Sequence, residues 1–384
     1  MNKNLNLLSL FSGCGGMDLG FEGGFDIMGT HLSKTRFKTV FANDIKQPAK
    51  TAWSNYFTRK GLSEDIYRVD SIVDLVKKHK DSGDVFPVDI DLITGGFPCQ
   101  DFSVSGKRLG LESDKCHSGK RITDDTPNGE NRGHLYRWMC DVISIVKPKM
   151  FVAENVKGLV NLADVKSIIE EDFRNNGYLV VPAKVLNAAD YGVAQSRERV
   201  IFFGFKKSAL TVQALKALSN ETITDEYCPY PLPVDGEIKL KSVLSGLQEP
   251  HESNDLSQRK HSKAKYMGAH CQGQTEVNLD GVAPTIRSEH HGNIEFRRLS
   301  KENGGRYIDE LNMGLKERRL TVRECARIQT FPDDYEFVFN SDNGSVSASE
   351  AYKLIGNAVP PLFAYHIAKR IENNWSLYFG TDDR

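Results

Sequence analysis

The feature that most constrains the fold is an alternation of short apolar runs with helical stretches through the first 205 residues. The apolar and β-branched runs, which we expect to form strands, span residues 5–11, 38–42, 89–94, 150–153, 179–186 and 200–205. Helix-like segments lie between several of them, at residues 48–57, 135–146 and 165–175. Such alternation predicts an α/β fold with a parallel sheet covered by helices on both faces. In sheets of this kind, ligands bind at the carboxyl ends of the strands.

The pattern changes after about residue 207, which predicts a second domain. Residues 221–255 contain the Pro-rich run YCPYPLPVDG and show weak periodicity, and Gly, His and Arg are scattered through residues 260–306. This composition is typical of an irregular, loop-rich domain. We therefore expect a large domain from residues 1–207 plus 341–384 and a small domain from residues 208–340.

Two helices are expected near the C-terminal end. A helix at residues 321–329 has Thr321 as its N-cap, and Glu324 three residues later completes a capping-box pattern. A second helix follows Pro360 and Pro361 and is expected to pack back on the large domain.

Composition excludes several classes of protein. Hydrophobic residues make up 39% of the chain and charged residues 26%, as in ordinary globular proteins. No run of about 18 apolar residues occurs, so we expect no membrane span. The N-terminal residues suit a first strand better than a signal peptide. Seven cysteines without a CxxC pair argue against a disulfide framework or a structural zinc site, and favour a reducing compartment such as the cytoplasm.

The charge is unevenly distributed. The net charge is −1, but residues 258–327 hold 14 Lys or Arg against 9 Asp or Glu, a balance of +5, which leaves −6 for the rest of the chain. A basic region on an otherwise acidic protein suits local phosphate binding. A solvated charged surface remains the alternative interpretation.

A glycine-rich turn follows the first expected strand. Its sequence, FSGCGG, has the spacing G-x-G-G, and the absence of G-x-G-x-x-G disfavours a dinucleotide-binding dehydrogenase. Asp44 ends the second major strand, where a carboxylate can accept both hydroxyls of an adenosine ribose. Asp70 could reach the adenine edge, although a surface Asp is the commoner reading. The turn and Asp44 together predict a nucleoside site.

A cysteine lies at the carboxyl end of another expected strand, in the sequence GGFPCQ. The ring of Pro98 restricts its own φ angle, and the glycines at positions 95 and 96 leave room for a flat ligand. Cys99 therefore sits on a tight turn, where free amides can stabilise a thiolate. Taken alone, such a cysteine is more often an inert core residue, so its interpretation depends on the groups around it.

Two further motifs end or begin neighbouring strands. Glu154 closes the strand that ends AENV, where in a cleft it could hold a proton and donate it to a ring nitrogen. The sequence QSRER leads into the strand at 200–205, and alternation places Arg197 and Arg199 on one face, directed with Gln195 at the same cleft. An exposed salt-bridged stretch is the alternative.

These groups suit one reaction. Carbon 5 of cytosine is a poor nucleophile, but addition of a thiolate at carbon 6, with an acid at ring nitrogen 3, gives an enamine that can attack a methyl sulfonium. A thiol, a carboxyl group and arginines beside an adenosine site supply what this covalent route needs.

Six motifs occur in the order found in one family. FSGCGG, GGFPCQ, ENV, QSRER, RRLTVRECARIQTFPDDY and LIGNAVPP span residues 7–205 and 318–370, and the chain thereby resembles the cytosine-5 DNA methyltransferases. The resemblance implies a Rossmann-like domain that binds S-adenosylmethionine, with S-adenosylhomocysteine as its product, and a smaller target-recognition domain. It implies that Cys99 attacks carbon 6, that Glu154 contacts nitrogen 3, and that Arg199, with Arg197, steadies the base. The residues implied to line the cofactor pocket are Phe11, Gly13, Cys14, Gly16, Asp44, Ile45, Asp70, Ser71, Pro98, Leu135, Asn357 and Val359.

Some positions depart from the family pattern. Glu is commoner where Asp44 stands, and the motif usually written GD-I reads VDSI here, which makes Ser71 a less certain contact. Ser103 would lie on a loop that closes over the flipped base. Residues 111–132 are longer than that loop requires, and we interpret them as a flexible insertion or a DNA contact.

The resemblance implies double-stranded DNA as the partner. A cytosine in a duplex must be extruded before it can react, and residues 208–318 would read the sequence in the major groove. Candidate contacts there are Arg287, His290, His291, Arg297 and Arg298. We expect a monomeric bacterial or phage enzyme that is cytoplasmic and associated with DNA. We also expect it to belong to a restriction-modification system, with a companion endonuclease that forms no stable complex with it.

Two rival functions differ in substrate or class. A methyltransferase for transfer RNA is known in the same family, but its recognition region is short, whereas this chain has about 110 unmatched residues. A DNA-binding protein without catalysis is the other rival, and the intact Cys99, Glu154 and Arg199 argue against it.

Overall fold

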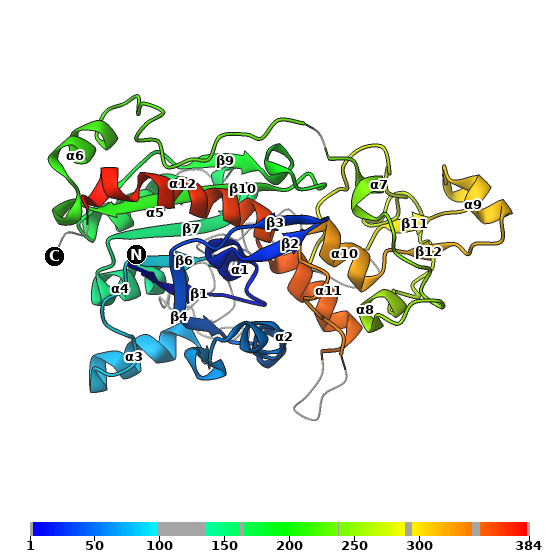
Figure 1. The fold of residues 1–384 in the computed structure, drawn as a ribbon, viewed down its shortest axis with the longest axis horizontal. Helices are drawn as coiled ribbons and strands as arrows, with labels where there is room; N and C mark the ends of the chain where they lie inside the picture. Colours follow the sequence, from blue (N-terminus) through cyan, green and yellow to red (C-terminus); the bar gives the residue numbers. More distant parts are fainter. Residues whose placement is uncertain are drawn as a thin grey trace, which may run out of the picture.

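The computed structural model describes residues 3–97, 135–161, 165–236, 238–288, 294–339 and 346–381. Its main element is an eight-stranded sheet in the order β5-β4-β1-β6-β7-β10-β8, with β9 paired to β10 (Figure 1). The strands are β1 (Leu5–Leu10), β4 (Phe37–Asp44), β5 (Tyr67–Val69), β6 (Leu92–Gly95), β7 (Met150–Val156), β8 (Tyr178–Val180), β9 (Lys184–Asn187) and β10 (Glu198–Lys206).

The sheet is parallel from β5 to β7, as predicted, but β10 runs antiparallel to β7, β8 and β9. A parallel pairing needs a crossover of a dozen or more residues. Only residues 188–197 join β9 to β10, and their one regular element is the short 3-10 helix Ala188–Tyr191. The chain therefore turns back and pairs antiparallel. The expected strand at 179–186 is split in two near Pro182, which has no backbone N–H to donate.

Helices cover both faces of the sheet, as predicted. They are α1 (Gly16–Glu22), α2 (Gln47–Phe57), α3 (Ile72–Ser82), α4 (Leu135–Val146), α5 (Val165–Asn175), α6 (Val212–Leu218) and α12 (Pro361–Phe379). Alternate residues of β7 belong to two separate apolar clusters: Met150 and Val152 pack with α1, α2 and α12, whereas Phe151 and Ala153 pack with α3, α4 and α5. This alternation is the period of two expected for a strand with two buried faces.

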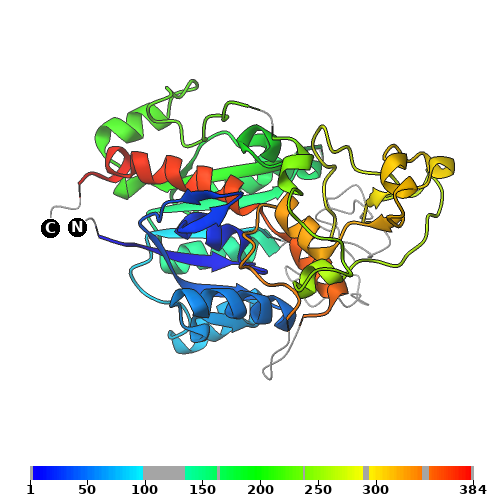
Figure 2. The same ribbon diagram turned by 45° about the vertical axis from the view of Figure 1, so that its right-hand side comes forward.

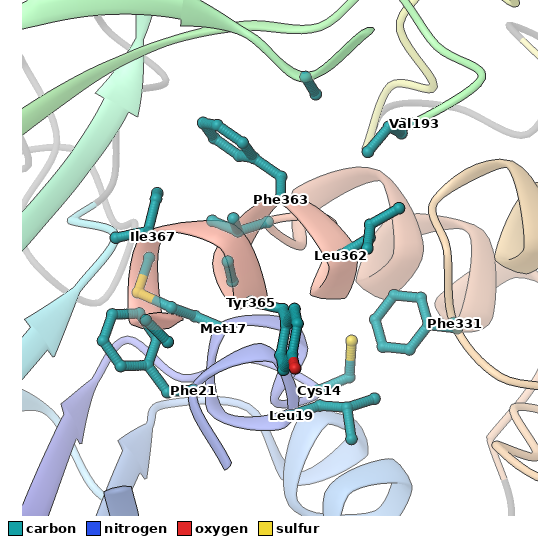
Figure 3. Packing of buried hydrophobic residues seen from close by; sticks show 14 of the residues in the cluster. Cys14, Met17, Leu19, Phe21, Val193, Phe331, Leu362, Phe363, Tyr365 and Ile367 are labelled. Atoms are coloured by element: carbon teal, nitrogen blue, oxygen red, sulfur yellow. The ribbon is translucent and has the colours of Figure 1, made fainter. Parts of the chain in front are cut away.

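Helix α1 packs closely against α12. A Cβ atom on Gly20 would lie only 2.4 Å from Ala364 Cβ and 2.4 Å from Pro361 O, so a glycine is needed at this contact. Figure 3 shows Met17 and Phe21 of α1 beside Ile367 of α12 in the same apolar cluster. The close packing fixes α1, and with it the glycine-rich turn that precedes it, against the C-terminal helix.

The smaller part of the molecule lies at the end opposite the N-terminus (Figure 2). It holds α7 (Leu240–Val243), α8 (Leu256–Arg259), β11 (Phe296–Arg298), α9 (Ile308–Asn312), β12 (Arg318–Arg319), α10 (Val322–Ile328) and the adjoining α11 (Ala348–Asn357). Its elements are short and joined by long irregular segments, as predicted. A small hairpin, β2 (Phe25–Ile27) with β3 (Thr30–Leu32), belongs to the larger part.

The capping box at the start of α10 is present. Thr321 Oγ1 accepts a hydrogen bond from the backbone N–H of Glu324, and the Glu324 carboxylate accepts one from the N–H of Thr321. Helix α12 begins at Pro361, as expected. Helix α6 packs against α12, so the chain stays with the sheet for some residues beyond 207. The division into domains at residues 207 and 341 stays a prediction.

Candidate active site

The predicted nucleophile and the loop after it lie outside the described residues: Pro98, Cys99, Ser103 and residues 111–132. The backbone that leads to Cys99 is described. Strand β6 ends at Gly95, and the carbonyl oxygen of Phe97 accepts a hydrogen bond of 3.2 Å from Asn155 Nδ2. A Cβ atom on Gly96 would lie 3.1 Å from Glu154 Oε2. The motifs GGFPCQ and ENV are therefore in contact, because β6 and β7 are neighbours.

Glu154 forms an ion pair with Arg199. The distance from Glu154 Oε1 to Arg199 Nε is 2.7 Å, and their side chains are 11% and 10% exposed. In the antiparallel pair of β7 and β10, Glu154 stands opposite Ile201, so Arg199 is its diagonal neighbour on the same face of the sheet. The ENV and QSRER motifs, which the sequence analysis directed at one cleft, are therefore joined by an ion pair.

Burial dominates the electrostatics of Glu154. Removal from water raises the pKa of this carboxyl, and the charges of Arg199 and Arg197 oppose the increase without cancelling it. A raised pKa favours a carboxyl group that can hold a proton near neutral pH. The site can thus present a proton, or accept one, beside the backbone that carries Cys99.

Arg197 is held by backbone carbonyl groups. Its side chain is 1% exposed, and its two amino groups donate hydrogen bonds to the carbonyl oxygens of Ile286 at 3.0 Å, Gly356 at 2.8 Å and Ala358 at 2.9 Å. These bonds join the QSRER motif to two distant segments. The contact of Arg197 with a base, implied by the resemblance, stays a prediction.

Gln195 is fully buried, whereas the sequence suggested that it faces the cleft. Its Oε1 accepts a hydrogen bond from the N–H of Ile286 at 2.9 Å, and its Nε2 donates to Gln329 Oε1 at 2.9 Å. Gln329 Nε2 donates in turn to the carbonyl oxygen of Ile355 at 2.6 Å. Sequence reasoning missed Gln329, because its partners come from segments more than 25 residues away.

The glycine-rich turn after β1 has the backbone of a ligand-binding turn. Phe11, Gly13 and Gly15 have positive φ angles of 53°, 56° and 79°. A Cβ atom on Gly13 would meet nothing within 4 Å, so there is open space in front of this residue. A Cβ atom on Gly16, in contrast, would lie 2.4 Å from the carbonyl oxygen of Val359. The turn is therefore pressed against the LIGNAVPP segment on one side and open on the other.

Asp44 lies beside this open space. It ends β4, and its Oδ2 and Oδ1 accept hydrogen bonds from the backbone N–H of Gly13 at 3.1 Å and of Lys46 at 3.0 Å. Burial raises the pKa of the Asp44 carboxyl, although these amides and the charge of Lys46 oppose the increase. Ile45 is 47% exposed, an unusual position for a large apolar side chain. The arrangement suits a ribose on the carboxylate and an adenine on Ile45.

The other predicted pocket residues are in different surroundings. Asp70 is exposed, whereas Ser71 is buried and caps α3 by accepting a hydrogen bond of 3.2 Å from the N–H of Val73. Leu135 begins α4 and is 4% exposed, and Asn357 ends α11 at the surface. Ser71 thus has a structural role that the sequence did not indicate.

Cys14 is unsuited to nucleophilic chemistry. It is 1% exposed, and burial raises the pKa of its thiol far above the ordinary value. Two tyrosines hold the turn from outside: Tyr67 donates to the carbonyl oxygen of Gly13 at 2.7 Å, and Tyr335 to that of Cys14 at 2.5 Å. No sequence motif pointed to Tyr67, whereas Tyr335 lies in the FPDDY run.

The basic residues proposed to read DNA are mostly occupied within the protein. Arg298 is 1% exposed and pairs with Glu249 at 2.6 Å and Glu310 at 2.8 Å. Arg297 also pairs with Glu310, at 3.1 Å, and Arg287 lies 3.9 Å from a carboxylate oxygen of Glu295. The suggestion that Arg298 is free to contact bases is wrong, because its guanidinium stabilises the interior of the small part. His290 and His291 lie outside the described residues.

Among the helices of the described ranges, none combines the length and apolarity that crossing a bilayer requires. The same ranges hold no group of three or more His, Cys, Asp or Glu residues placed to bind a metal ion.

Comparison with known proteins identifies the family. The family model described as C-5 cytosine-specific DNA methylase matches residues 5–373. The chain belongs to this family. As a C-5 cytosine-specific DNA methylase, it is an enzyme that transfers a methyl group to carbon 5 of cytosine in DNA.

Individual relatives match most of this methylase. The type II methyltransferase M.NgoFVII of Neisseria gonorrhoeae is 31% identical over 375 residues, which cover 95% of this chain and 86% of that protein. The type II methyltransferase M.BsuRI of Bacillus subtilis is 32% identical over 394 residues, covering 98% of this chain and 80% of that protein.

Solved structures show the same fold. The Entamoeba histolytica methyltransferase EhMeth superposes with a TM-score of 0.62 at 16% identity, covering 97% of this chain and 99% of its own. The S. pombe Dnmt2 methyltransferase gives a TM-score of 0.60 at 17% identity, covering 96% and 99%. The predicted Rossmann-like methyltransferase fold is confirmed.

Proposed function

We propose that this methylase uses Cys99 as its nucleophile and S-adenosylmethionine as its methyl donor, and that it modifies one short sequence in double-stranded DNA. The observation that carries the proposal is the contact of Gly96 with the Glu154–Arg199 ion pair. Cys99 follows Gly96 by three residues, so its turn begins where a proton donor and a cation already meet.

The residues around the glycine-rich turn fit the cofactor. Asp44 would hold the two ribose hydroxyls, Gly13 leaves open space for the ligand, and exposed Ile45 offers an apolar surface to adenine. When bound, S-adenosylmethionine supplies an electrophilic methyl group on a sulfonium. Phe11, Cys14, Gly16, Asp70, Ser71, Pro98, Leu135, Asn357 and Val359 complete the proposed lining, and Ser71 and Cys14 contribute through the backbone they support.

The chain's own groups would activate the base. Cys99 Sγ, as a thiolate, forms a bond to carbon 6 of cytosine, and Glu154 holds a proton at ring nitrogen 3. The electrons of the 5,6 double bond then become available at carbon 5. After carbon 5 has accepted the methyl group, its proton passes to water and the C–H electron pair re-forms the 5,6 double bond as Cys99 Sγ leaves as a thiolate. The proton at ring nitrogen 3 returns to Glu154, which restores the aromatic base and the free enzyme.

The two arginines would divide their tasks. Arg199 would pair with Glu154 and orient the Glu154 carboxyl toward the base. The remaining N–H groups of Arg199 would donate hydrogen bonds to the carbonyl oxygen of cytosine. Arg197 is a positioning residue, because its hydrogen bonds run to the backbone of residues 286, 356 and 358.

The named relatives suggest the biological setting. M.NgoFVII and M.BsuRI are type II methyltransferases, and we propose that this enzyme likewise protects DNA in a restriction-modification system. A cytosine in a duplex must leave the base stack to reach Glu154. We propose that the small part reads the flanking bases, and that the enzyme works as a cytoplasmic monomer with a companion endonuclease that acts on the same site.

Bisulfite sequencing would test the proposal. DNA from a host without cytosine methylation would be compared after expression of the wild type, of Cys99→Ala, or of Cys271→Ala as a control at a partly buried cysteine outside the site. Protected cytosines in one short context, lost only with Cys99→Ala, would support it. Methylated transfer RNA without methylated DNA, or protection that survives Cys99→Ala, would contradict it.

A further inference from the structure

A buried glutamine at the end of α10 connects three segments and has no part in the mechanism above. Gln329 is the residue that follows α10, and it has no exposed surface. Its Nε2 donates hydrogen bonds to the carbonyl oxygens of Ile355 at 2.6 Å and Ala358 at 3.4 Å, and its Oε1 accepts one from Gln195 Nε2 at 2.9 Å. A buried amide that lacks partners is costly, so these three bonds fix the orientation of the side chain.

The backbone directly after Gln329 is strained. Thr330 has a φ angle of 64°, a left-handed conformation that β-branched residues rarely adopt, and it is 3% exposed. Its N–H donates to the carbonyl oxygen of Arg327 at 2.8 Å, and its Oγ1 accepts from the N–H of Leu362 in α12 at 3.0 Å. Strain of this kind persists only where the surrounding contacts determine it, and it is concentrated at functional sites. The strained turn therefore fixes where α10 ends, and with it the position of Gln329.

The hydrogen bonds of Gln329 are part of a closed ring. Gln329 and Arg197 donate to the same carbonyl oxygen, that of Ala358, at 3.4 Å and 2.9 Å. Gln195 and Arg197 both bind the backbone of Ile286, at its N–H and at its carbonyl oxygen. The ring thus runs from Gln329 through Gln195, Ile286, Arg197 and Ala358 back to Gln329. A buried network of this kind holds the segments that it joins in one arrangement.

The ring lies directly before the proposed catalytic pair. Gln195 and Arg197 precede or flank the first residue of β10, Glu198, and Arg199 is the second residue of that strand. Alternation along the chain places Arg197 and Arg199 on one face, and Arg199 Nε lies 2.7 Å from Glu154 Oε1. We infer that Gln329 is a positioning residue for methyl transfer, which holds the start of β10 so that Arg199 stays on Glu154. This inference rests on the roles proposed above for Glu154 and Arg199.

Gln329→Met tests the inference, because methionine has a similar length and no carboxamide. Single-turnover transfer of labelled methyl groups would be measured with saturating DNA and S-adenosylmethionine, below the unfolding temperature of the variant. The rate should fall about tenfold or more, since a small misplacement of groups near the reacting atoms has large effects on the rate. A rate within about twofold of the wild type in the folded variant would overturn the inference.

Gln258→Met is the matched control. Gln258, on α8, is 1% exposed, and its carboxamide donates to the carbonyl oxygen of Gln248 at 2.7 Å and accepts from Thr321 Oγ1 at 2.6 Å, at the other end of α10. Both variants lose buried hydrogen bonds, so both should unfold at lower urea concentrations than the wild type. Gln258→Met should nevertheless keep the rate within about twofold. Equal slowing in the two variants would assign the effect to lost packing and overturn the inference.

The dependence of the rate on pH separates positioning from a general loss of structure. Burial raises the pKa of Glu154, and the charges of Arg199 and Arg197 oppose the increase. If Gln329→Met loosens Arg199, the pKa of Glu154 should rise further. The alkaline limb of the rate profile, where Glu154 loses its proton, should then move to higher pH in Gln329→Met and stay in place in Gln258→Met. A limb at the same pH in Gln329→Met and the wild type would contradict the assignment.

Two further variants complete the test. Gln195→Met removes the bond to Gln329 from the other side, so it should slow methyl transfer in the same way, and it replaces Gln329→Met if that variant does not fold. A wild-type rate in Gln195→Met would also overturn the inference. Glu154→Gln in the same assay tests the proposed function separately. Full activity of Glu154→Gln would refute the proposed proton donor, whereas a slow Glu154→Gln beside an unaffected Gln329→Met would refute only the positioning role of Gln329.

Discussion

Glu154 and Arg199 lie on adjacent antiparallel strands with 2.7 Å between Oε1 and Nε, and about nine-tenths of each side chain is buried. The pair is therefore both a structural contact and the proposed source of the proton. Removal of either charge leaves the other buried without a partner, which costs several kcal/mol in typical proteins.

Glu154→Gln should abolish most of the methyl transfer. The amide cannot supply a proton at ring nitrogen 3, so the rate of a single turnover should fall by about 10²-fold or more. The matched control is Glu198→Gln on the neighbouring strand β10, where Glu198 forms an exposed pair with Lys157 and the change should be nearly neutral. Single-turnover transfer of labelled methyl groups measures both. A rate in Glu154→Gln within threefold of the wild type would remove Glu154 from the mechanism.

Arg197→Lys should destabilise the protein. One ammonium group cannot reach the carbonyl oxygens of Ile286, Gly356 and Ala358 together, so at least one buried acceptor loses its donor. We expect a loss of about 2 kcal/mol in the free energy of unfolding, measured with urea. Arg68→Lys, at an exposed position on β5, is the control and should change it by less than about 0.5 kcal/mol. An unchanged unfolding midpoint for Arg197→Lys would argue for a direct role at the base instead.

Arg298→Met should affect stability and leave the electrostatics of DNA binding intact. The substitution removes one guanidinium from Glu249 and Glu310, which keep Arg318 and Arg297 as partners, so it should cost about 1–3 kcal/mol. A buried guanidinium neutralises no phosphate, so the slope of log K against log salt should be unchanged. Arg259→Met, at an exposed position on α8, should leave the stability near the wild-type value. A slope reduced by about one in Arg298→Met would show that Arg298 does contact a phosphate.

Glu295 should make stability depend on pH. Burial raises the pKa of its carboxyl to about 7, against 4.5 for the unperturbed group. The folded state binds the Glu295 proton more tightly than the unfolded state does, so protonated Glu295 stabilises the fold by up to about 3 kcal/mol. This stabilisation is complete below pH ~4.5 and is lost as the pH rises through ~7. Glu295→Gln should flatten this dependence, so the variant should gain stability relative to the wild type at pH 8. Denaturant midpoints at pH 5 and pH 8 measure the change, and an equal pH dependence in both proteins would contradict the assignment.

Local patterns were sufficient to predict much of the fold. The helices at 135–146 and 165–175 occur as α4 and α5 with the same bounds, because each has a strong apolar face of helical period. The direction of β10 was not predictable in this way, since alternation along a strand is the same whichever way the strand runs. Its antiparallel pairing follows from the short connection at 188–197, a tertiary constraint.

The same distinction between local sequence patterns and tertiary contacts applies to the candidate site. Glu154 and the arginines of QSRER were predicted to face one cleft, and Glu154 and Arg199 share an edge of the sheet because β10 runs antiparallel to β7. Arg298 was misjudged because charge counts do not distinguish a paired arginine from a free one. Sequence reasoning gave no role to Asp18, because its hydrogen-bond partners Ser9 and Trp53 lie on β1 and α2 and become its neighbours only in the folded chain.

Gln195 and Arg197 hold Ile286 by hydrogen bonds to its backbone N–H and carbonyl oxygen. These two bonds do not involve the side chain of Ile286, whose identity is restricted only by its packing in the apolar core. Residues 283–286 can therefore dock in one fixed position while the segments they introduce vary in sequence. If the small part reads the flanking bases as proposed, its loops can be exchanged against an unchanged sheet, provided that residues 283–286 keep their backbone path.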